Sequence, residues 1–181
     1  MKRGFPVAGD ETKLIVRAQA GDVRAFERLL REIAPRLGGY IRRLVGNDAI
    51  ADEIAQEAFW RMWRGIGWLR DPALFRPWAY RIATREAYRT IGREQKHVAG
   101  RNDVAELDAL PAPEVDATLR VDIERSLSRV SPAARVVLAV HYLEGLSLEE
   151  TAAAADIPVG TVKSRLASGL KQMRALMEET P

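Results

Sequence analysis

The chain has 181 residues, of which 47% are hydrophobic and 29% are charged, with a formal net charge of +3. This length is enough for one domain or for two small domains, each with its own core. The absence of cysteine excludes disulfides, thiolate zinc sites and thiol redox sensing, and two histidines are too few to suggest a metal site. No apolar run is long enough to span a bilayer and no signal peptide is evident, so we expect a cytoplasmic protein without membrane insertion.

Apolar residues recur at helical spacing along most of the chain. The exception is the stretch from His97 to Glu114, which contains two prolines and several acidic residues. The sequence therefore predicts an all-α fold: two small helical domains, 1–95 and 116–181, joined by a flexible acidic linker over 96–115. We expect the second to be a four-helix domain that ends in a helix-turn-helix. The predicted helices cover residues 10–20, 22–45, 48–64, 73–92, 116–129, 132–143, 147–154 and 159–177.

Positive charge is concentrated before the predicted linker. Residues 1–100 hold 19 basic and 12 acidic side chains, whereas residues 101–118 hold one basic and five acidic side chains. A basic first half indicates a polyanionic partner such as nucleic acid.

The helix predicted over 48–64 has one apolar and one polar face. On a helical wheel, Trp60 falls in the middle of the polar face. An aromatic side chain there either packs under a neighbouring segment, such as Trp68 or the next helix, or anchors a partner. We favour the interface, because tryptophan is enriched among the residues that dominate binding energy.

Four arginines recur at i+4 in the next predicted helix: Arg81, Arg85, Arg89 and Arg93. Such a row repels itself unless it meets a counter-charge, and Glu86 is the only acid between Pro77 and Gly92. Nucleic-acid phosphate is the natural counter-charge. Aromatic residues just upstream are suited to unstacked bases, although most of these rings must belong to a core; they are Trp68, Phe75, Trp78 and Tyr80.

Residues 146–166 have the pattern of a helix-turn-helix. Ser147 and Glu150 form a capping box, Asp156 suits a left-handed turn, and Pro158 favours the start of a second helix. From Val159 to Ala175 this second helix has four basic residues and no acidic ones. A short polar and basic N-terminal end is typical of a helix that enters the major groove.

These segments, in this order, resemble an extracytoplasmic-function (group IV) sigma factor of bacterial RNA polymerase. Residues 13–30 are similar to the opening of the family, 52–64 to its polymerase-binding helix and 75–83 to the start of its minus-ten helix. Residues 127–143, with the helix-turn-helix, are similar to its minus-thirty-five domain.

The resemblance implies an alternative sigma factor without catalytic residues, metal or cofactor, and so not an enzyme. Its partners would be the beta-prime and beta subunits of the polymerase core, promoter DNA and an anti-sigma factor. The implied polymerase-binding residues are Asp52, Glu53, Gln56, Glu57 and Trp60. The implied minus-ten residues are Trp68, Trp78, Arg81, Arg85, Tyr88 and Arg89, and the implied minus-thirty-five residues are Thr161, Lys163, Ser164, Arg165, Ser168 and Lys171.

Several positions depart from the family pattern. Arg85 stands where the family usually carries Asn, and Asp156 where Gly is typical. The minus-ten base preference of relatives therefore does not transfer. In the second helix we favour Lys163 and Ser164 over Arg165 as base contacts, because Arg165 directly precedes the expected core residue Leu166 and is therefore expected to turn towards the domain. The alternative role for Arg165 is to brace the helix-turn-helix by reaching Glu149 or Glu150.

Two other functions remain open at this stage. A stand-alone helix-turn-helix regulator would explain residues 116–181 but would leave the helix at 52–64 without a purpose. A sigma mimic that binds an anti-sigma factor is disfavoured by the basic row at 81–93, because a mimic has no need to bind DNA.

Overall fold

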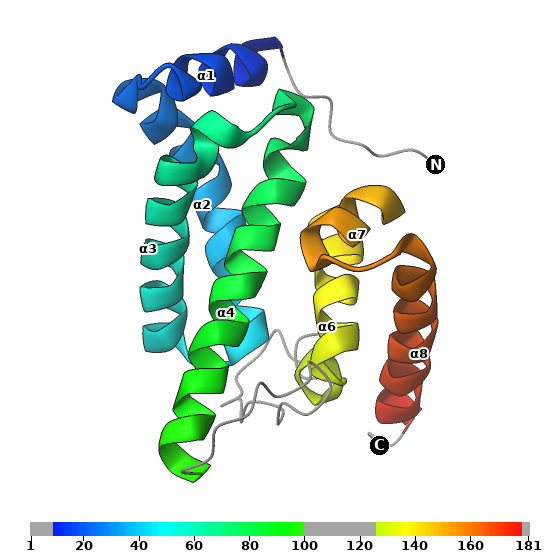
Figure 1. Ribbon diagram of the computed structural model, residues 1–181. Coiled ribbons are helices and arrows are strands. Elements are labelled where there is room, and N and C mark those ends of the chain that lie inside the picture. The colour runs from blue at the N-terminus through cyan, green and yellow to red at the C-terminus, as the bar shows by residue number, and fades with distance from the viewer. Residues whose placement is uncertain (1–8, 100–125, 179–181) are drawn as a thin grey trace.

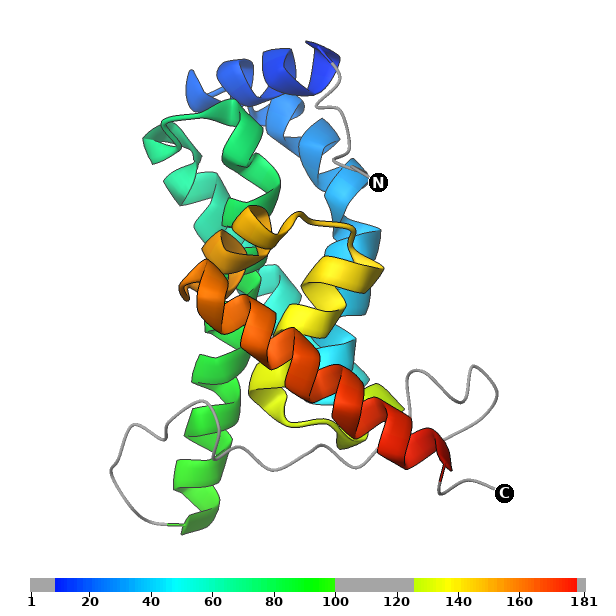
Figure 2. The ribbon, with the colours of Figure 1, turned by 90° about the vertical axis from the view of Figure 1, so that its right-hand side faces the viewer.

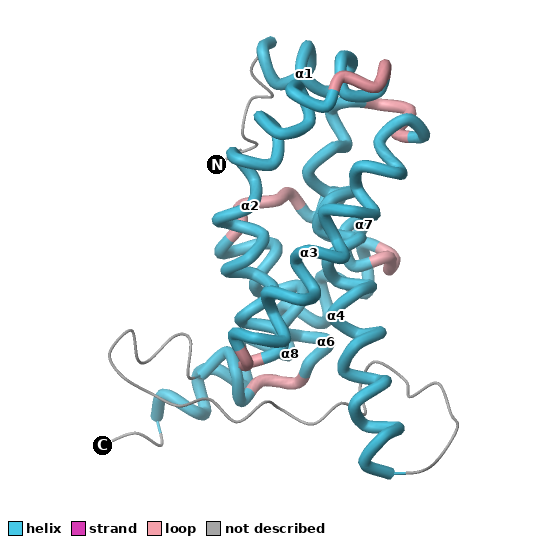
Figure 3. The backbone as a smooth tube through the Cα atoms, turned by 90° about the vertical axis from the view of Figure 1, so that its left-hand side faces the viewer, coloured by secondary structure: helices cyan, strands magenta, loops and turns pink. Residues whose placement is uncertain are grey.

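The structure is a computed structural model that describes residues 9–99 and 126–178, and every regular element in these ranges is a helix (Figures 1 and 3). The predicted all-α fold is confirmed for this part of the chain. The longer elements are α1 (Gly9–Gln19), α2 (Val23–Val45), α3 (Asp48–Gly65), α4 (Phe75–Ala99), α6 (Pro132–Leu138), α7 (Leu148–Ala155) and α8 (Val159–Glu178). Short turns are η1 (Ile66–Trp68), η2 (Pro72–Leu74) and the π-helical turn η4 (Ala139–Leu143), and residues 126–129 are helical.

Most of the predicted linker lies outside the described residues, as does the predicted helix at 116–129 up to residue 125. Residues 96–99 continue α4, which is longer than the predicted 73–92. Within the described ranges, no helix is both long and apolar enough to cross a membrane.

The first four helices form what we call the N-terminal bundle, in which α2, α3 and α4 lie side by side (Figure 1). The side chain of Asp22 caps α2 by accepting a hydrogen bond from the Ala25 amide at 3.1 Å, and Gly46 ends the helix at φ 69°. On α4, Ala79, Ala83 and Ala87 are all fully buried. Their i+4 spacing places small side chains on one face, which brings α4 close to its neighbours.

The C-terminal bundle, α6 to α8, contains the predicted helix-turn-helix. The Ser147 hydroxyl accepts from the Glu150 amide at 3.1 Å, and the Glu150 carboxylate accepts from the Ser147 amide at 2.7 Å. Asp156 ends α7 in the left-handed conformation at φ 58° and ψ 44°. The capping box and the turn are therefore confirmed.

The two bundles are in contact, with α7 against α4 (Figure 2). Two buried polar groups lie at this contact. The Tyr80 hydroxyl donates a hydrogen bond to Glu144 at 2.6 Å, and Glu144 also pairs with Arg43 at 3.5 Å. Arg135 is 1% exposed and donates to the carbonyl of Leu44 in α2 at 3.2 Å. The position of the C-terminal bundle thus depends on polar as well as apolar contacts.

Two glycines of α8 differ in how closely other side chains approach them, and this difference can be tested by substitution. A Cβ at Gly169 would lie 2.7 Å from the Leu138 Cδ1 atom and 3.1 Å from the Ala134 Cβ atom, whereas one at Gly160 would meet no atom within 4 Å. We expect Gly169→Ala to lower the free energy of unfolding by about 1–2 kcal/mol, because overpacking outweighs the gain in helix propensity. Gly160→Ala, the matched control, should leave stability unchanged or raise it by up to about 1 kcal/mol. Urea unfolding followed by circular dichroism measures both; equal effects would contradict the close packing of α6 on α8.

Candidate functional site

The outer face of α3 carries the five residues predicted to bind polymerase. The Asn47 side chain starts the helix by accepting from the Ile50 amide at 3.1 Å. Four of the five side chains are exposed and Glu57 is half-buried; they are Asp52, Glu53, Gln56, Glu57 and Trp60. Trp60 is 52% exposed, and the Arg64 guanidinium lies over its ring at 4.7 Å. The ring therefore lies on the surface, as the wheel predicts, and is covered on one side by a cation.

The aromatic residues around η1 divide into core and surface. Phe75 and Tyr80 are 2% exposed, and Trp78 is half-buried, with its ring 6.0 Å from that of Phe75. Trp68 is 87% exposed. The fold positions it by anchoring η1, since the Gln19 amide donates to the Leu69 carbonyl at 2.6 Å. Of the predicted minus-ten aromatics, Trp68 is the most exposed, whereas Trp78 and Tyr88 are half-buried.

Two of the four arginines in the α4 row have carboxylate partners, which local sequence patterns did not predict. Arg85 pairs with Asp156 of the C-terminal bundle at 2.6 Å, and Arg89 pairs with Glu86 at 3.3 Å. Tyr88 donates a hydrogen bond to the Pro132 carbonyl at 3.3 Å, and Arg81 is half-buried. The six predicted minus-ten residues thus lie along η1 and α4, and two of them contact the C-terminal bundle.

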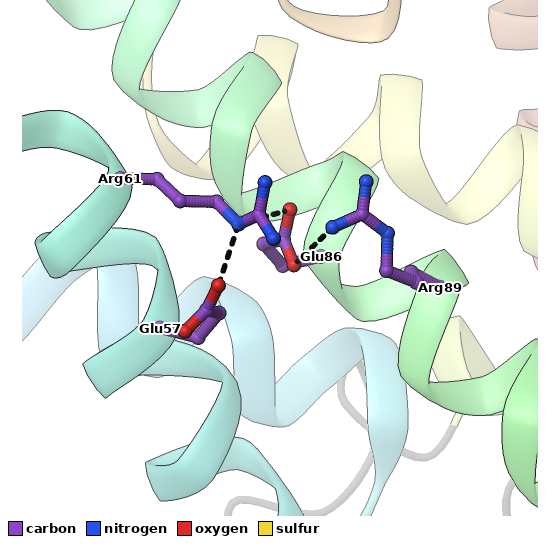
Figure 4. Close-up of polar contacts among 4 residues, drawn as sticks. All are labelled: Glu57, Arg61, Glu86 and Arg89. Atoms are coloured by element: carbon purple, nitrogen blue, oxygen red, sulfur yellow. Dashed lines mark hydrogen bonds and ion pairs between the residues drawn. The ribbon is translucent and has the colours of Figure 1, made fainter. Parts of the chain in front are cut away.

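Glu86 is the group that sequence reasoning missed. It is 3% exposed, and its carboxylate binds Arg61 of α3 at 2.9 Å as well as Arg89, so it lies between two cations (Figure 4). Arg61 is further held by Glu57 at 2.7 Å. The sequence signal was present, because Glu86 is the only acid in the arginine row, but its partner on α3 depends on how the two helices face each other.

The cluster borders a basic groove between α3 and α4. The groove encloses about 350 Å³ and is lined by Trp60, Arg61, Arg64, Gly65, Ile82, Arg85, Glu86 and Arg89. Four arginines against one carboxylate make this surface positive, and such a surface attracts phosphate. Because Trp60 forms part of its wall, the groove joins the predicted polymerase-binding face to the predicted minus-ten face.

The outer face of α8 carries the predicted minus-thirty-five residues. Val162 and Leu166 are buried and anchor the helix. The predicted residues are exposed except for two that are half-buried, Thr161 and Arg165; the exposed ones are Lys163, Ser164, Ser168 and Lys171. Lys163 and Ser164 are thus more exposed than Arg165. Within the described residues, no ion pair joins Arg165 to Glu149 or Glu150.

Two family models match the chain: Sigma-70 region 2 over residues 29–97 and Sigma-70 region 4 over residues 120–173. The chain is 32% identical to the RNA polymerase sigma-H factor of Pseudomonas aeruginosa, over 86% of this chain and 88% of that protein. It is also 32% identical to the sigma factor CarQ of Myxococcus xanthus, over 90% and 95%. Identity to the ECF sigma-E factor of Escherichia coli is 28%, over 84% and 86%. The chain belongs to the extracytoplasmic-function sigma factors.

It is thus an alternative sigma factor, which serves promoter-specific transcription. The region 2 match covers α3, α4 up to residue 97 and most of α2, and the region 4 match covers α6, α7 and most of α8. Its fold is similar to that of CnrH, solved with the cytosolic domain of CnrY, with a TM-score of 0.71 over 95% of this chain and 99% of that chain at 21% identity. RpoE of Bartonella quintana gives 0.69 over 88% and 100% at 22% identity. These structures share the fold of this sigma factor.

The buried carboxylate in the groove should matter for the stability of this sigma factor. We expect Glu86→Gln to lower the free energy of unfolding by about 1–3 kcal/mol, because the neutral amide removes the charge that two guanidiniums face and turns one of the two acceptor oxygens into an NH2 donor. Glu57→Gln is the matched control: it removes a contact of Arg61 from a carboxylate that is 42% exposed, and should cost about 0.5 kcal/mol or less. Denaturant unfolding of the two variants measures the difference. If Glu57→Gln proved the costlier change, Glu86 would not be the centre of the cluster.

Proposed function

We propose that this alternative sigma factor binds core polymerase through the outer face of α3 and promoter DNA through two further surfaces. The minus-ten surface comprises η1 and the arginine row of α4, and the minus-thirty-five surface is the outer face of α8. The observation that carries the proposal is the exposed Trp60 beside the basic groove. Trp60 can anchor a protein partner, and the neighbouring arginines can bind a polyanion. A subunit that holds DNA on a polymerase needs both kinds of surface next to each other.

The proposal extends to partners and location. The factor would act in the cytoplasm, without enzymatic activity of its own, on the beta-prime and beta subunits of the polymerase. An anti-sigma factor would control it. This last partner is supported by the similar RpoE of Bartonella quintana, which was solved in complex with the anti-sigma factor NepR.

In-vitro transcription with purified core polymerase and a promoter library tests the function directly. We expect transcripts from a subset of promoters only when both the factor and the core are present. A stand-alone helix-turn-helix regulator would instead bind DNA without the core and would not be retained on immobilised core polymerase.

Truncation of Trp60 separates polymerase binding from folding. We expect Trp60→Ala to weaken binding to core polymerase by about 2 kcal/mol or more, which is ~30-fold, with little change in stability since the ring is half-exposed. The matched control is Trp68→Ala, which removes a still more exposed tryptophan from the minus-ten surface. It should preserve core binding and weaken promoter opening. Equal loss of core affinity in both variants would contradict the assignment of separate faces.

Basic residues along α8 should differ in their effects on sequence preference. Lys163 lies in the first two turns, within reach of base edges, whereas Lys171 lies farther along and should meet phosphate. We expect Lys163→Ala to relax preference at one position of the minus-thirty-five element by about 1–3 kcal/mol. Lys171→Ala should weaken all sequences about equally. Selection from a randomised minus-thirty-five library, read by sequencing, distinguishes the two results; a uniform loss in both variants would mean that Lys163 contacts only the backbone.

A further inference from the structure

Gln172 of α8 caps the start of α6, a helix distant from it in sequence. α6 begins after Ser131, whose side chain makes no capping hydrogen bond. In a capping box the third helical residue accepts a hydrogen bond from the amide of the capping residue. Glu150 does this in α7, but the third residue of α6 is Ala134, which has no acceptor. The Gln172 Oε1 atom takes this place and accepts from the Ser131 amide at 3.0 Å.

The close packing of α8 on α6 brings Gln172 to this position (Figures 1 and 2). Gly169 lies one turn before Gln172 and is buried against α6, where a Cβ would lie only 2.7 Å from the Leu138 Cδ1 atom. Ser168 also lies one turn before Gln172 but is exposed. Because residues three and four apart are neighbours on a helix, the half-buried Gln172 side chain reaches both the contact with α6 and the outer face of α8.

The Ser131 amide determines which way the carboxamide of Gln172 faces. A backbone N–H can only donate, so the carboxamide oxygen faces Ser131 and the NH2 group faces the other way. This NH2 group donates to the Ser168 Oγ atom at 3.2 Å. A serine hydroxyl has one proton, so while its oxygen accepts from Gln172, the proton points elsewhere. Accepting a hydrogen bond also polarises the hydroxyl and makes it a better donor.

The hydroxyl protons of two exposed serines on α8 are used differently. Ser164 donates to the Thr161 carbonyl at 3.0 Å, a common use of a serine hydroxyl within a helix. Among residues 9–99 and 126–178, no group accepts a hydrogen bond from the Ser168 hydroxyl. Ser168 lies in the third turn of α8, beyond the turns that reach base edges and one turn before Lys171. The acceptor expected at this place on a DNA-binding helix is a phosphate oxygen.

We propose that Gln172 is a positioning residue that aims the Ser168 hydroxyl proton at a phosphate oxygen of the minus-thirty-five element. The proposal rests on the proposed DNA-binding role of α8 and adds one contact to that surface. A hydrogen bond from a hydroxyl to a phosphate is charge-assisted and adds affinity, but it places no cation on the DNA and releases no counterion. It strengthens binding to all minus-thirty-five sequences alike, since phosphates carry no sequence information.

The substitution Gln172→Glu reverses the hydrogen bond to Ser168 and keeps the cap of α6. One carboxylate oxygen still accepts from the Ser131 amide, and the other accepts from the Ser168 hydroxyl, which draws its proton away from DNA. The variant also adds a negative charge near DNA. A double-mutant cycle with Ser168→Ala removes this effect, because the charge acts on both backgrounds. Urea unfolding should show Gln172→Glu to be as stable as wild type, since the cap remains.

The cycle is measured as the affinity of the full-length factor, bound to core polymerase, for a fluorescently labelled promoter duplex. We expect Ser168→Ala to weaken binding by ~2- to 10-fold, the range for one hydrogen bond. Gln172→Glu should weaken binding more in the wild-type background than in the Ser168→Ala background, by this same factor. Equal effects of Gln172→Glu on the two backgrounds would overturn the positioning role.

Salt dependence distinguishes the hydroxyl from a cation. Ser168→Ala should leave the slope of log K against log[salt] unchanged, whereas Lys171→Ala, the comparison variant, should flatten it by about 1. Ser168→Ala should also weaken all members of a randomised minus-thirty-five library alike. Loss of preference for one base in Ser168→Ala would reveal a base contact and refute the phosphate assignment.

The wild-type protein distinguishes failure of this proposal from failure of the proposed function. A wild-type holoenzyme whose promoter affinity is independent of the minus-thirty-five sequence would refute the DNA-binding role of α8, and the role of Gln172 with it. If wild-type affinity depends on that sequence and the cycle shows no coupling between Gln172 and Ser168, only the positioning role is refuted.

Discussion

A buried guanidinium joins the two bundles at the ends of α2 and α6. Arg135 donates hydrogen bonds to the carbonyls of Leu127, Ser128 and Val130 and, across the bundle contact, to Leu44 in the last turn of α2. Carbonyls at helix ends carry partial negative charge, so they serve as counter-charge where a carboxylate would otherwise be needed. Burial lowers the pKa of Arg135 to about 10, which leaves the group charged at neutral pH. The start of α6 is thereby joined to the end of α2, and α7 packs on α4 through contacts of its own.

Local sequence signals were sufficient to predict most helices and, at several positions, where they begin or end. The capping box at Ser147 and the turn at Asp156 involve residues within one or two turns of each other, so side-chain chemistry determines them directly. The exposure of Trp60 followed from the wheel, because the apolar arc of α3 is wide and regular. Ion pairs between side chains of different helices could not be predicted from these local signals. Glu86 meets Arg61 only because of how α3 and α4 are rotated, and that rotation is set by packing.

Arg135 and Asp156 show a second limit of sequence reasoning. An arginine in a helix next to apolar residues is expected at the surface, yet Arg135 is among the most buried side chains because carbonyls from two bundles surround it. Asp156 was interpreted through its backbone alone, and its side chain has a separate long-range role. In both cases the partner is contributed by a segment distant in sequence, and no local pattern encodes it.

The two carboxylates that pair with the arginine row differ in burial and in the bundle to which they belong. Glu86 is buried on α4 itself, so Arg89 and Arg61 keep their partner whatever the C-terminal bundle does. Asp156 is exposed and belongs to the other bundle, so Arg85 keeps its partner only while the bundles are in contact. A phosphate approaching the groove would therefore find two guanidiniums held by a buried carboxylate of α4 and a third, Arg85, whose carboxylate partner is exposed and lies on the C-terminal bundle. One arginine row thus combines a counter-charge buried on its own helix with an exposed counter-charge supplied by the other bundle.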